Sequence, residues 1–226
     1  MSIIIDDVQV HGFEPTVRGV RNPMNSWEKS DSGNYDEYGV FQRVGKNDLA
    51  LMNKLRKAGP DHGKFMRMIQ VWVDITAPLY WWKQFDQYKV GVTTDSCSTM
   101  HKIHSKEFTL DDFSHEFLFY EAKNCLKETI RVLNMYRDVY LNGGKILGTN
   151  DIYSDPFEPK NKDIWWQMIQ LLPSSYNQKR TVNLNYEVLH DIYHARKNHK
   201  LDEWHAVCRW IEDLPYSELI TGKTEE

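Results

Sequence analysis

The stretch 59–100 constrains the fold most, because its pattern changes from strand to helix to polar loop within a short length. Residues 65–75 alternate, and both alternating sets of side chains are mostly apolar, which predicts a strand inside a sheet. A threonine N-cap and Pro78 in the first turn then predict a helix over 77–89. The loop 90–100 that follows is rich in small and polar residues. Such a loop presents backbone N–H groups to anions, so we expect a binding site here.

The size and charge of the chain restrict its class. With 226 residues, the chain can bury one sizeable core and is too short for two ordinary domains. Its net charge is −4 with the signs interspersed, which gives no basic surface for duplex nucleic acid or for an anionic membrane. No apolar run reaches the roughly 18 residues of a membrane-spanning helix, and the N-terminus lacks a cleavable leader pattern. We therefore expect a soluble cytoplasmic protein whose partners are small molecules.

The three cysteines are Cys97, Cys125 and Cys208, an odd number at spacings that match neither a disulfide framework nor a zinc motif. We expect free thiols, as in a reducing compartment. Cys97 lies in the polar loop and is a conceivable nucleophile. No base is fixed by its spacing, however, so a structural role is favoured.

Helical periodicity and capping signals continue along the rest of the chain. They predict helices over 48–58, 116–142, 163–172, 185–198 and 202–213, a strand and turn over 3–17, and loops over 22–39 and 144–162. Asn47 is the expected N-cap of the first helix. Thr109 and Asp112 have the spacing of a capping box with aspartate in place of glutamate, which predicts the start of a short helix.

Asn185 and Arg196 lie in one predicted helix and are eleven residues apart. At 3.6 residues per turn, their side chains fall on nearly the same side, about 16 Å apart along the axis. An amide and a guanidinium on one helix face could together hold a long ligand. His190 and His194 form an i, i+4 pair that could bind zinc, but they lie on the opposite face and lack the glutamate of a zinc-protease motif. Ordinary histidines are favoured there.

The chain resembles the flavin-dependent thymidylate synthases of the ThyX type over residues 48–100 and 163–205. The likeness rests on a helix followed by a strand that runs into a second helix, on a later Leu-Pro helix stop, and on three unchanged residues. These are Gln84, Asn185 and Arg196. The order and spacing of the features match better than the individual residues do.

The resemblance implies an architecture and an assembly. It predicts an α+β fold, a single ThyX-like domain over 1–226, with a central antiparallel or mixed sheet packed by several helices, one of them long. A loop-rich segment 1–46 and an insert around 104–162 would be added to that domain. The family forms homotetramers whose active sites are shared between subunits, so a homotetramer is expected here.

The resemblance also implies a chemistry. In that family a reduced flavin relays a one-carbon unit from methylene tetrahydrofolate to deoxyuridylate, with NADPH as reductant and without a protein nucleophile. The implied groups are FAD as cofactor, NADPH and methylene tetrahydrofolate as co-substrates, a small nucleotide as ligand, and no metal. Arg196 would be the catalytic residue, because its guanidinium would stabilise the ionised uracil ring. The implied nucleotide-binding residues are Gln84, Lys89, Asp95, Cys97, Ser98 and Arg196, and the implied cofactor-binding residues are Gln87, Tyr88, Lys89, Asn185 and Asp191.

Several positions depart from the family pattern. Its Arg-His-Arg signature is Gln-Tyr-Lys at 87–89, its Ser-x-Arg element is Cys-Ser-Thr at 97–99, and its phosphate-binding arginine falls on Ile169. Arginine binds phosphate through a rigid two-pronged fork, whereas lysine offers a point charge and the other side chains offer none. Glu187 stands where the family has a flavin-contacting arginine, and a carboxylate there repels a flavin pyrophosphate. Deoxyuridylate is therefore not expected to be bound in the family manner.

Other polar and aromatic residues have two interpretations each. The basic residues near the loop either supply replacement anion contacts or form a solvated face, and the second is favoured; they are Lys89, His101, Lys102, His104 and Lys106. The tryptophan pairs at 81–82 and 165–166 either stack on a ligand or fill the core, and core filling is favoured.

The sequence thus leaves two hypotheses about function. The first is a divergent flavin-dependent thymidylate synthase-like protein that binds a nucleotide and carries out reductive methylation of a pyrimidine nucleotide with folate and NADPH. The alternative is a non-catalytic nucleotide-binding or regulatory protein on the same scaffold, which the lost arginines favour. The sequence does not decide whether the chain is an enzyme.

Overall fold

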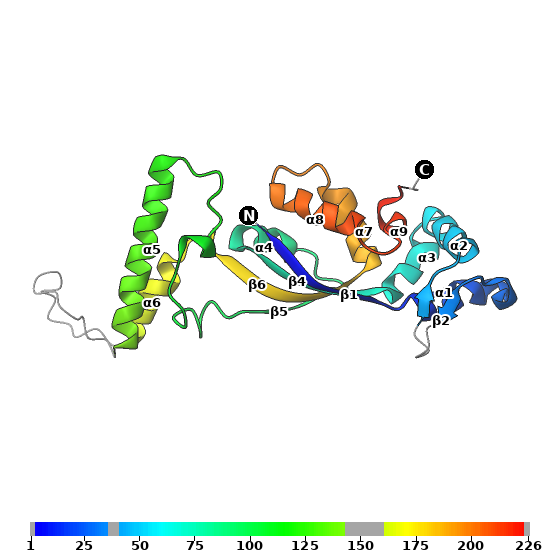
Figure 1. The fold of residues 1–226 in the computed structure, drawn as a ribbon, viewed down its shortest axis with the longest axis horizontal. Coiled ribbons are helices and arrows are strands. Elements are labelled where there is room, and N and C mark those ends of the chain that lie inside the picture. The colour runs from blue at the N-terminus through cyan, green and yellow to red at the C-terminus, as the bar shows by residue number, and fades with distance from the viewer. Residues whose placement is uncertain (1–2, 36–40, 143–160, 224–226) are drawn as a thin grey trace, which may run out of the picture. The chain divides into compact units, whose positions relative to one another are not determined.

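A computed structural model describes residues 3–35, 41–142 and 161–223 of the chain (Figure 1). The described part is α+β, with a four-stranded antiparallel sheet in the order β1-β4-β6-β5 and a separate two-stranded hairpin, β2-β3. The strands are β1 (Ile4–His11), β2 (Gly33–Tyr35), β3 (Phe41–Arg43), β4 (Gln70–Pro78), β5 (Thr93–Ser96) and β6 (Asn177–Asn185). The helices are α1 (Phe13–Arg21), α2 (Lys46–Lys57), α3 (Pro60–Gly63), α4 (Leu79–Phe85), α5 (Tyr120–Leu141), α6 (Asn161–Leu171), α7 (Tyr186–Arg196), α8 (Asp202–Glu212) and α9 (Glu218–Thr221). Short 3₁₀ helices span Asn22–Met24, Trp27–Lys29, Lys64–Met68 and Leu110–Asp112.

The chain divides into two compact units. Unit 1 contains the first four residues together with 76–85 and 96–180. Unit 2 contains 5–75, 86–95 and 181–226. Among the described residues, no helix combines the length and the apolar character that a membrane span requires.

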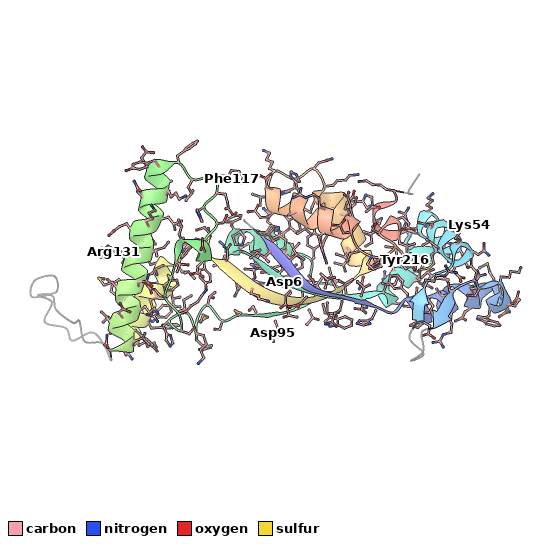
Figure 2. All side chains as sticks on the ribbon, in the orientation of Figure 1. Asp6, Lys54, Asp95, Phe117, Arg131 and Tyr216 are labelled. Atoms are coloured by element: carbon pink, nitrogen blue, oxygen red, sulfur yellow. The ribbon has the colours of Figure 1, made fainter. Side chains whose placement is uncertain are left out.

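The core of unit 1 lies between α5, α6 and the segment that precedes α5. Its buried side chains are Ile103, Phe108, Phe113, Leu126, Ile130, Leu133 and Met168. The side-chain amide of Asn134 binds both the N–H and the carbonyl of Phe108, each at 2.8 Å, and so holds the preceding segment to α5. The other side of α5 is exposed and carries Arg131, while Phe117, just before the helix, is also exposed (Figure 2).

In unit 2 the sheet packs against helices on one of its faces. Val71, Val73 and Ile75 of β4 are buried, whereas the intervening Trp72 is exposed and Asp74 is half-buried. This alternation matches a strand with one covered face. Helices α7, α8 and α9 lie on the same side of the sheet segments of this unit (Figure 1).

A buried ion pair fixes the segment between α1 and α2 in unit 2. The Nε of Arg21 donates to the carboxylate of Asp48 at 2.6 Å, and both side chains are almost fully buried. The hydroxyls of Ser30 and Ser32 donate to the second oxygen of Asp48. Burial alone would raise the pKa of Asp48, but these hydrogen bonds and the charge of Arg21 hold it below its usual value.

The predicted strand over 65–75 was wrong in its first half. Residues Lys64–Met68 form a 3₁₀ helix, and β4 begins only at Gln70. Phe65 and Met66 are both buried although they are adjacent. Adjacent side chains of a strand point to opposite faces, whereas one turn of a helix can bury both on one side. The apolar alternation therefore gave no sign that the backbone changes from a 3₁₀ helix to a strand within this stretch.

The predicted helix over 77–89 was too long at both ends. Thr76 and Pro78 belong to β4, so neither has the predicted role at the start of the helix, and α4 spans only Leu79–Phe85. The N–H groups of Leu79 and Tyr80 donate to the carbonyls of Tyr176 and Ser174, each at 3.0 Å. These two N–H groups, which have no acceptor within the helix, are thus bound by the segment before β6 rather than by a threonine cap.

The other predicted helices are confirmed with small shifts, but the predicted strand and turn over 3–17 run into α1, and the predicted loop over 22–39 contains two 3₁₀ helices and β2. The capping box of Thr109 and Asp112 is present, and the predicted helices from 48, 116, 163, 185 and 202 correspond to α2, α5, α6, α7 and α8. The predicted N-cap Asn47 lies inside α2, whose first N–H groups instead bind the carboxylate of Asp31. The three cysteines are unpaired, as predicted. The loop over 144–162 lies almost entirely outside the described residues.

Candidate functional site

Asn185 is the residue at which β6 ends and α7 begins. Its side-chain oxygen accepts hydrogen bonds from the N–H groups of Glu187 and Val188, each at 3.1 Å, so it is the N-cap of α7. The side chain is buried, and its Nδ2 has no hydrogen-bond partner among the described residues. Gly91 lies directly against it: a Cβ at Gly91 would be only 3.0 Å from this nitrogen. The helix cap uses the side-chain oxygen of Asn185 and leaves its Nδ2 available to a ligand.

Arg196 ends the same helix and is held by two aromatic residues. Its Nε donates to the hydroxyl of Tyr88 at 2.8 Å. Its guanidinium carbon lies 5.5 Å from the ring centre of Tyr88 and 4.8 Å from that of Trp204. Arg196 is half-buried, and within the described residues Nη1 and Nη2 have neither a hydrogen-bond partner nor a carboxylate. A half-buried, oriented guanidinium with donors left unpaired is suited to bind a planar acceptor or an anion.

His199 extends this aromatic group from the turn after α7. Its ring lies 6.3 Å from that of Trp204. Its Nδ1 accepts a hydrogen bond from the N–H of Leu201 at 3.1 Å, which places the proton of the neutral ring on Nε2. Burial and the positive charge of Arg196 lower the pKa of His199, so the neutral form predominates at neutral pH. A neutral N–H donor thus lies close to a permanent cation.

The other predicted residues of unit 2 lie on its surface. Gln87 and Lys89 are exposed on either side of Tyr88, and Asp95 is exposed in β5. Asp191 is exposed on α7, where its carboxylate binds the Nδ1 of His190 at 3.1 Å. The structure therefore brings Tyr88 next to Arg196, whereas none of these four predicted side chains forms a hydrogen bond or an ion pair with Arg196 or Asn185.

Three predicted nucleotide-binding residues belong to unit 1. Gln84 is half-buried in α4. Cys97 is exposed, and its backbone is bound to β6, since its N–H donates to Lys179 at 3.0 Å and its carbonyl accepts from Gln178 at 2.7 Å. The hydroxyl of Ser98 accepts from two backbone N–H groups of the next turn, at 3.2 and 2.8 Å. Cys97 and Ser98 thus have local structural partners.

The predicted basic group does not act as one cluster. Lys106 forms an ion pair with Asp112 of the capping box, which raises the pKa of the lysine. The ring of His104 packs on Tyr140 with 4.6 Å between the centres, and its buried Nδ1 has no hydrogen-bond partner within the described part of the chain. The remaining basic residues of the group are exposed.

Glu187, in the first turn of α7, has a cation beside it. Arg67 donates a hydrogen bond from Nε to its carboxylate, and the two form an ion pair. The sequence indicated a lone negative charge at this position, which would repel a pyrophosphate. Because Arg67 comes from the segment before β4, its charge offsets that of Glu187, and a guanidinium is present close to the start of α7.

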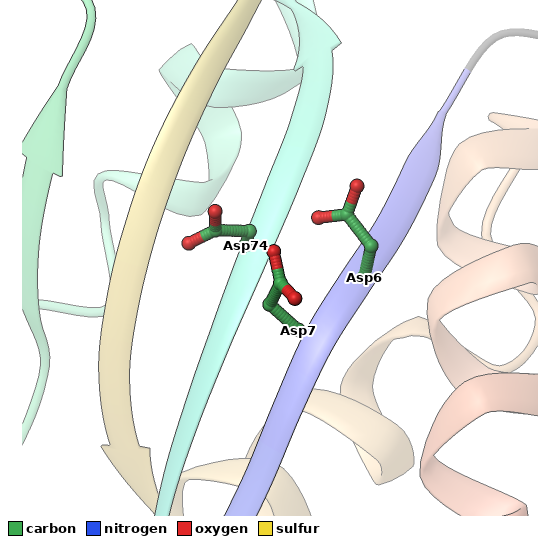
Figure 3. A group of neighbouring side chains, drawn as sticks. All are labelled: Asp6, Asp7 and Asp74. Carbon is green, nitrogen blue, oxygen red and sulfur yellow. The ribbon is translucent and has the colours of Figure 1, made fainter.

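An acidic group that the sequence did not indicate lies where β1 meets β4. Oxygen atoms of Asp6, Asp7 and Asp74 lie within 4.8 Å of one another (Figure 3). Asp74 also accepts a hydrogen bond from the hydroxyl of Thr181 at 2.6 Å. A cavity of about 380 Å³ adjoins the group, with Trp72 in its wall. The carboxylates are exposed or half-exposed, where water and counter-ions screen their repulsion, so their proximity alone identifies no metal site.

Sequence reasoning missed Gly91, His199 and Trp204 as parts of the site around Asn185 and Arg196. Trp204 lies in α8, and its distance from Arg196 depends on a turn between two helices rather than on helical spacing. Gly91 has a φ of +76°, a conformation that glycine adopts without strain. The only sign in the sequence that this loop approaches the side chain of Asn185 closely was the presence of a glycine in it.

We compared the chain with known proteins. No family model matches it, and no curated protein sequence matches it. Among solved structures, it is similar to the flavin-dependent thymidylate synthase ThyX from Helicobacter pylori complexed with FAD and dUMP, with a TM-score of 0.62 and 14% identity, covering 98% of this chain and 97% of that one. It is also similar to the UMP/dUMP methylase PolB from Streptomyces cacaoi bound with 5-Br dUMP, with a TM-score of 0.59 and 12% identity, covering 98% and 94%.

The chain has the ThyX fold. The similarity extends over nearly all of both chains, which agrees with the α+β architecture that the resemblance implied. Fold alone does not determine function, which depends on the residues of the site. Within the ThyX fold of this chain, Asn185 and Arg196 lie at the two ends of α7.

Proposed function

We propose that the chain binds a pyrimidine nucleotide through Arg196 and that, with a flavin, it carries out a reductive methylation of that nucleotide. The observation that carries the proposal is the guanidinium of Arg196, which Tyr88 and Trp204 orient while Nη1 and Nη2 stay free of partners among the described residues. Those two nitrogens offer parallel donors to a carbonyl oxygen of a pyrimidine and, once the ring is ionised, to its deprotonated ring nitrogen. Their positive charge would also stabilise an ionised ring.

The residues of unit 2 fit a flavin near the start of α7. Asn185 has a free Nδ2, Gly91 lacks a side chain that would cover it, and Arg67 supplies a guanidinium beside Glu187. Asn185 and Arg67 would therefore hold the flavin. When bound, FAD would supply the electrons for the transfer, after reduction by NADPH, and methylene tetrahydrofolate would supply the carbon. Arg196 would hold the nucleotide, and the neutral His199 would donate from Nε2.

A second candidate function is nucleotide binding without redox chemistry. The sequence Gln-Tyr-Lys at 87–89 and the residues Thr99 and Ile169 replace the four arginines of three elements in the family that the sequence resembles. Tyr88 instead orients Arg196. A binding or regulatory protein needs only that orientation, whereas catalysis also needs the flavin.

Calorimetry with deoxyuridylate and uridylate tests nucleotide binding. We expect Arg196→Lys to bind at least tenfold more weakly, because lysine keeps the charge but not the planar fork. Arg209→Lys, an exposed arginine of α8, is the matched control and should bind like the unmodified protein. Equal affinity of Arg196→Lys and the control would refute the proposed role of Arg196.

The absorbance spectrum of the purified protein separates the two candidates. A flavin spectrum and conversion of deoxyuridylate with methylene tetrahydrofolate and NADPH support the enzyme. A colourless protein that takes up no FAD, converts no substrate and is stabilised by a nucleotide supports the binding protein. Asn185→Asp keeps the helix cap but loses Nδ2, so it should fold normally and retain less flavin, whereas Asn185→Ala should also lose stability.

We further propose that the protein is a cytoplasmic homotetramer with sites shared between subunits. Light scattering with size-exclusion chromatography measures the assembly directly. A monomer at micromolar concentration would contradict this proposal.

A further inference from the structure

Arg56, in the last turn of α2, has no counter-ion among the described residues. Its Nε is buried and has no hydrogen-bond partner. Burial lowers the pKa of Arg56, and no carboxylate acts in the opposite direction. Arg56 as a whole is half-buried, and an unpaired, desolvated Nε on a cation is unfavourable, so proteins normally provide an anion or a set of acceptors for it.

The guanidinium of Arg56 lies against Gly222, which ends α9. A Cβ at this glycine would be 3.1 Å from Nη2 and 3.4 Å from Nη1. Gly222 has a φ of +75°, which most side chains rarely adopt. Helix α9 is only four residues long, so the partial charge of its last carbonyls is small compared with a full negative charge. The guanidinium thus packs against a glycine that has no side chain to cover it, and the backbone there does not neutralise its charge.

Three further basic side chains come from α7 and its C-cap, and one of them contacts α9. His190, His194 and Lys197 are spaced i, i+4 and i+7, which places them in one stripe. The two histidine rings lie 4.5 Å apart, and the Nε2 of His194 contacts the carbonyl of Ile220 at 3.2 Å. Burial lowers the pKa of His194, and the charges that lower it further are those of His190, Lys197 and Arg56. The charged groups with the largest effect on the pKa of His194 are therefore bases.

The carboxylates near this stripe are already engaged. Asp191 binds His190 at 3.1 Å and is exposed. Glu212 accepts hydrogen bonds from the hydroxyl of Tyr193 and from the Nζ of Lys223, each at 2.6 Å. Neither carboxylate is within hydrogen-bonding distance of Arg56.

We propose that Arg56 and Lys197, together with His190 and His194, bind an oxyanion group, a phosphate or a carboxylate, beside Gly222. The guanidinium offers two donors in the geometry that such a group prefers, and the anion offsets the repulsion among the bases. The site is separate from the one around Arg196. That residue follows His194 by two positions on α7, which turns it about 200° to another face of the helix.

Calorimetry on the full chain with sodium sulfate tests the proposal, because sulfate keeps its charge over the working pH range. Titrations at constant ionic strength against sodium chloride should show saturable binding and a saturable rise in Tm. Arg56→Gln should weaken sulfate binding at least tenfold. The control is Arg131→Gln, which changes an exposed arginine that pairs with Glu128 on α5. This substitution should leave the affinity for sulfate unchanged. A parallel titration with sodium acetate shows whether the site prefers a carboxylate.

A second variant keeps the test decisive if Arg56→Gln fails to fold. Lys197→Gln changes an exposed side chain and should weaken sulfate binding about threefold to tenfold. A Tm that rises linearly with sulfate and equally in all variants would be a general salt effect and would overturn the proposal. The same variants titrated with deoxyuridylate should bind it normally, so a failure at this site is distinguishable from a failure at Arg196.

Discussion

The hydroxyl of Tyr88 accepts a hydrogen bond from the Nε of Arg196 at 2.8 Å, and this contact sets the direction of the guanidinium at the end of α7. Because Nε is bound to Tyr88, the planar guanidinium is held in place and Nη1 and Nη2 remain as donors without a hydrogen-bond partner among the described residues. Position 88 is the middle of the Gln-Tyr-Lys tripeptide, at which the sequence departs from the Arg-His-Arg signature of the family that it resembles. Tyr88 binds Arg196, one of the residues on which that resemblance rests.

Tyr88→Phe removes this hydrogen bond and keeps the ring. A hydrogen bond to a charged group contributes about 1.5–3 kcal/mol, so we expect the affinity for deoxyuridylate to fall about tenfold. The free energy of unfolding should change by less than about 1 kcal/mol, because Arg196 is half-buried and water can replace the hydroxyl. Calorimetry and thermal unfolding measure the two effects. Unchanged affinity would mean that the contact does not orient the ligand-binding donors.

Gly91→Ala tests the close approach of Gly91 to Asn185. A new Cβ would be 3.0 Å from the Nδ2 of Asn185 and 3.2 Å from a methyl group of Val188, at a φ of +76°. The backbone strain and the crowding should together lower the free energy of unfolding by about 1–3 kcal/mol. In an Asn185→Ala background the crowding is relieved, so the added cost should be smaller. Additive costs in this double-mutant cycle, measured by chemical denaturation, would show that the two residues do not interact.

The sequence predicts those helices and turns that are determined by residues close together in the chain. The helices α2, α5, α7 and α8 begin and end within four residues of the predicted bounds, because periodicity and caps are properties of neighbouring residues. The capping box of Thr109 and Asp112 is likewise a local pattern and is confirmed. Strand β6 has no such signal, since its residues are mostly polar and its stability comes from pairing with the distant β4.

The candidate site is predictable only in part for the same reason. Asn185 and Arg196 share a helix, so their relation follows from spacing. The contacts of Arg196 with Tyr88 and Trp204 depend on how distant segments pack, and nothing in their spacing indicates them. The ion pair of Arg67 with Glu187 is also non-local, and it changes the local charge that the sequence suggested.

Asp48→Asn removes the buried partner of Arg21. The pKa of Asp48 is lowered in the folded protein, so its contribution to stability is fully present above the unfolded pKa of about 3.9 and is lost as the pH falls through the folded pKa. Leaving Arg21 buried without its partner should cost about 3–5 kcal/mol.

The difference in the free energy of unfolding between the unmodified protein and Asp48→Asn should therefore be constant from pH 8 to about 5 and should shrink below pH 4. Urea denaturation across this range measures it. Asp213→Asn, an exposed aspartate after α8, is the control and should change stability by less than about 0.5 kcal/mol. A difference that grows at acid pH would contradict the assigned sign.

The three thiols should differ in reactivity. Cys97 and Cys125 are exposed, whereas Cys208 is buried in α8, and burial raises its pKa to about 11. At pH 8 about one Cys208 side chain in a thousand is then a thiolate, the form that reacts. A thiol-disulfide reagent should therefore modify two thiols quickly in the native protein and the third only after denaturation. Cys208→Ala should leave the fast reaction unchanged and abolish the slow one, whereas three fast thiols in the native protein would show that α8 opens readily and exposes its inner face.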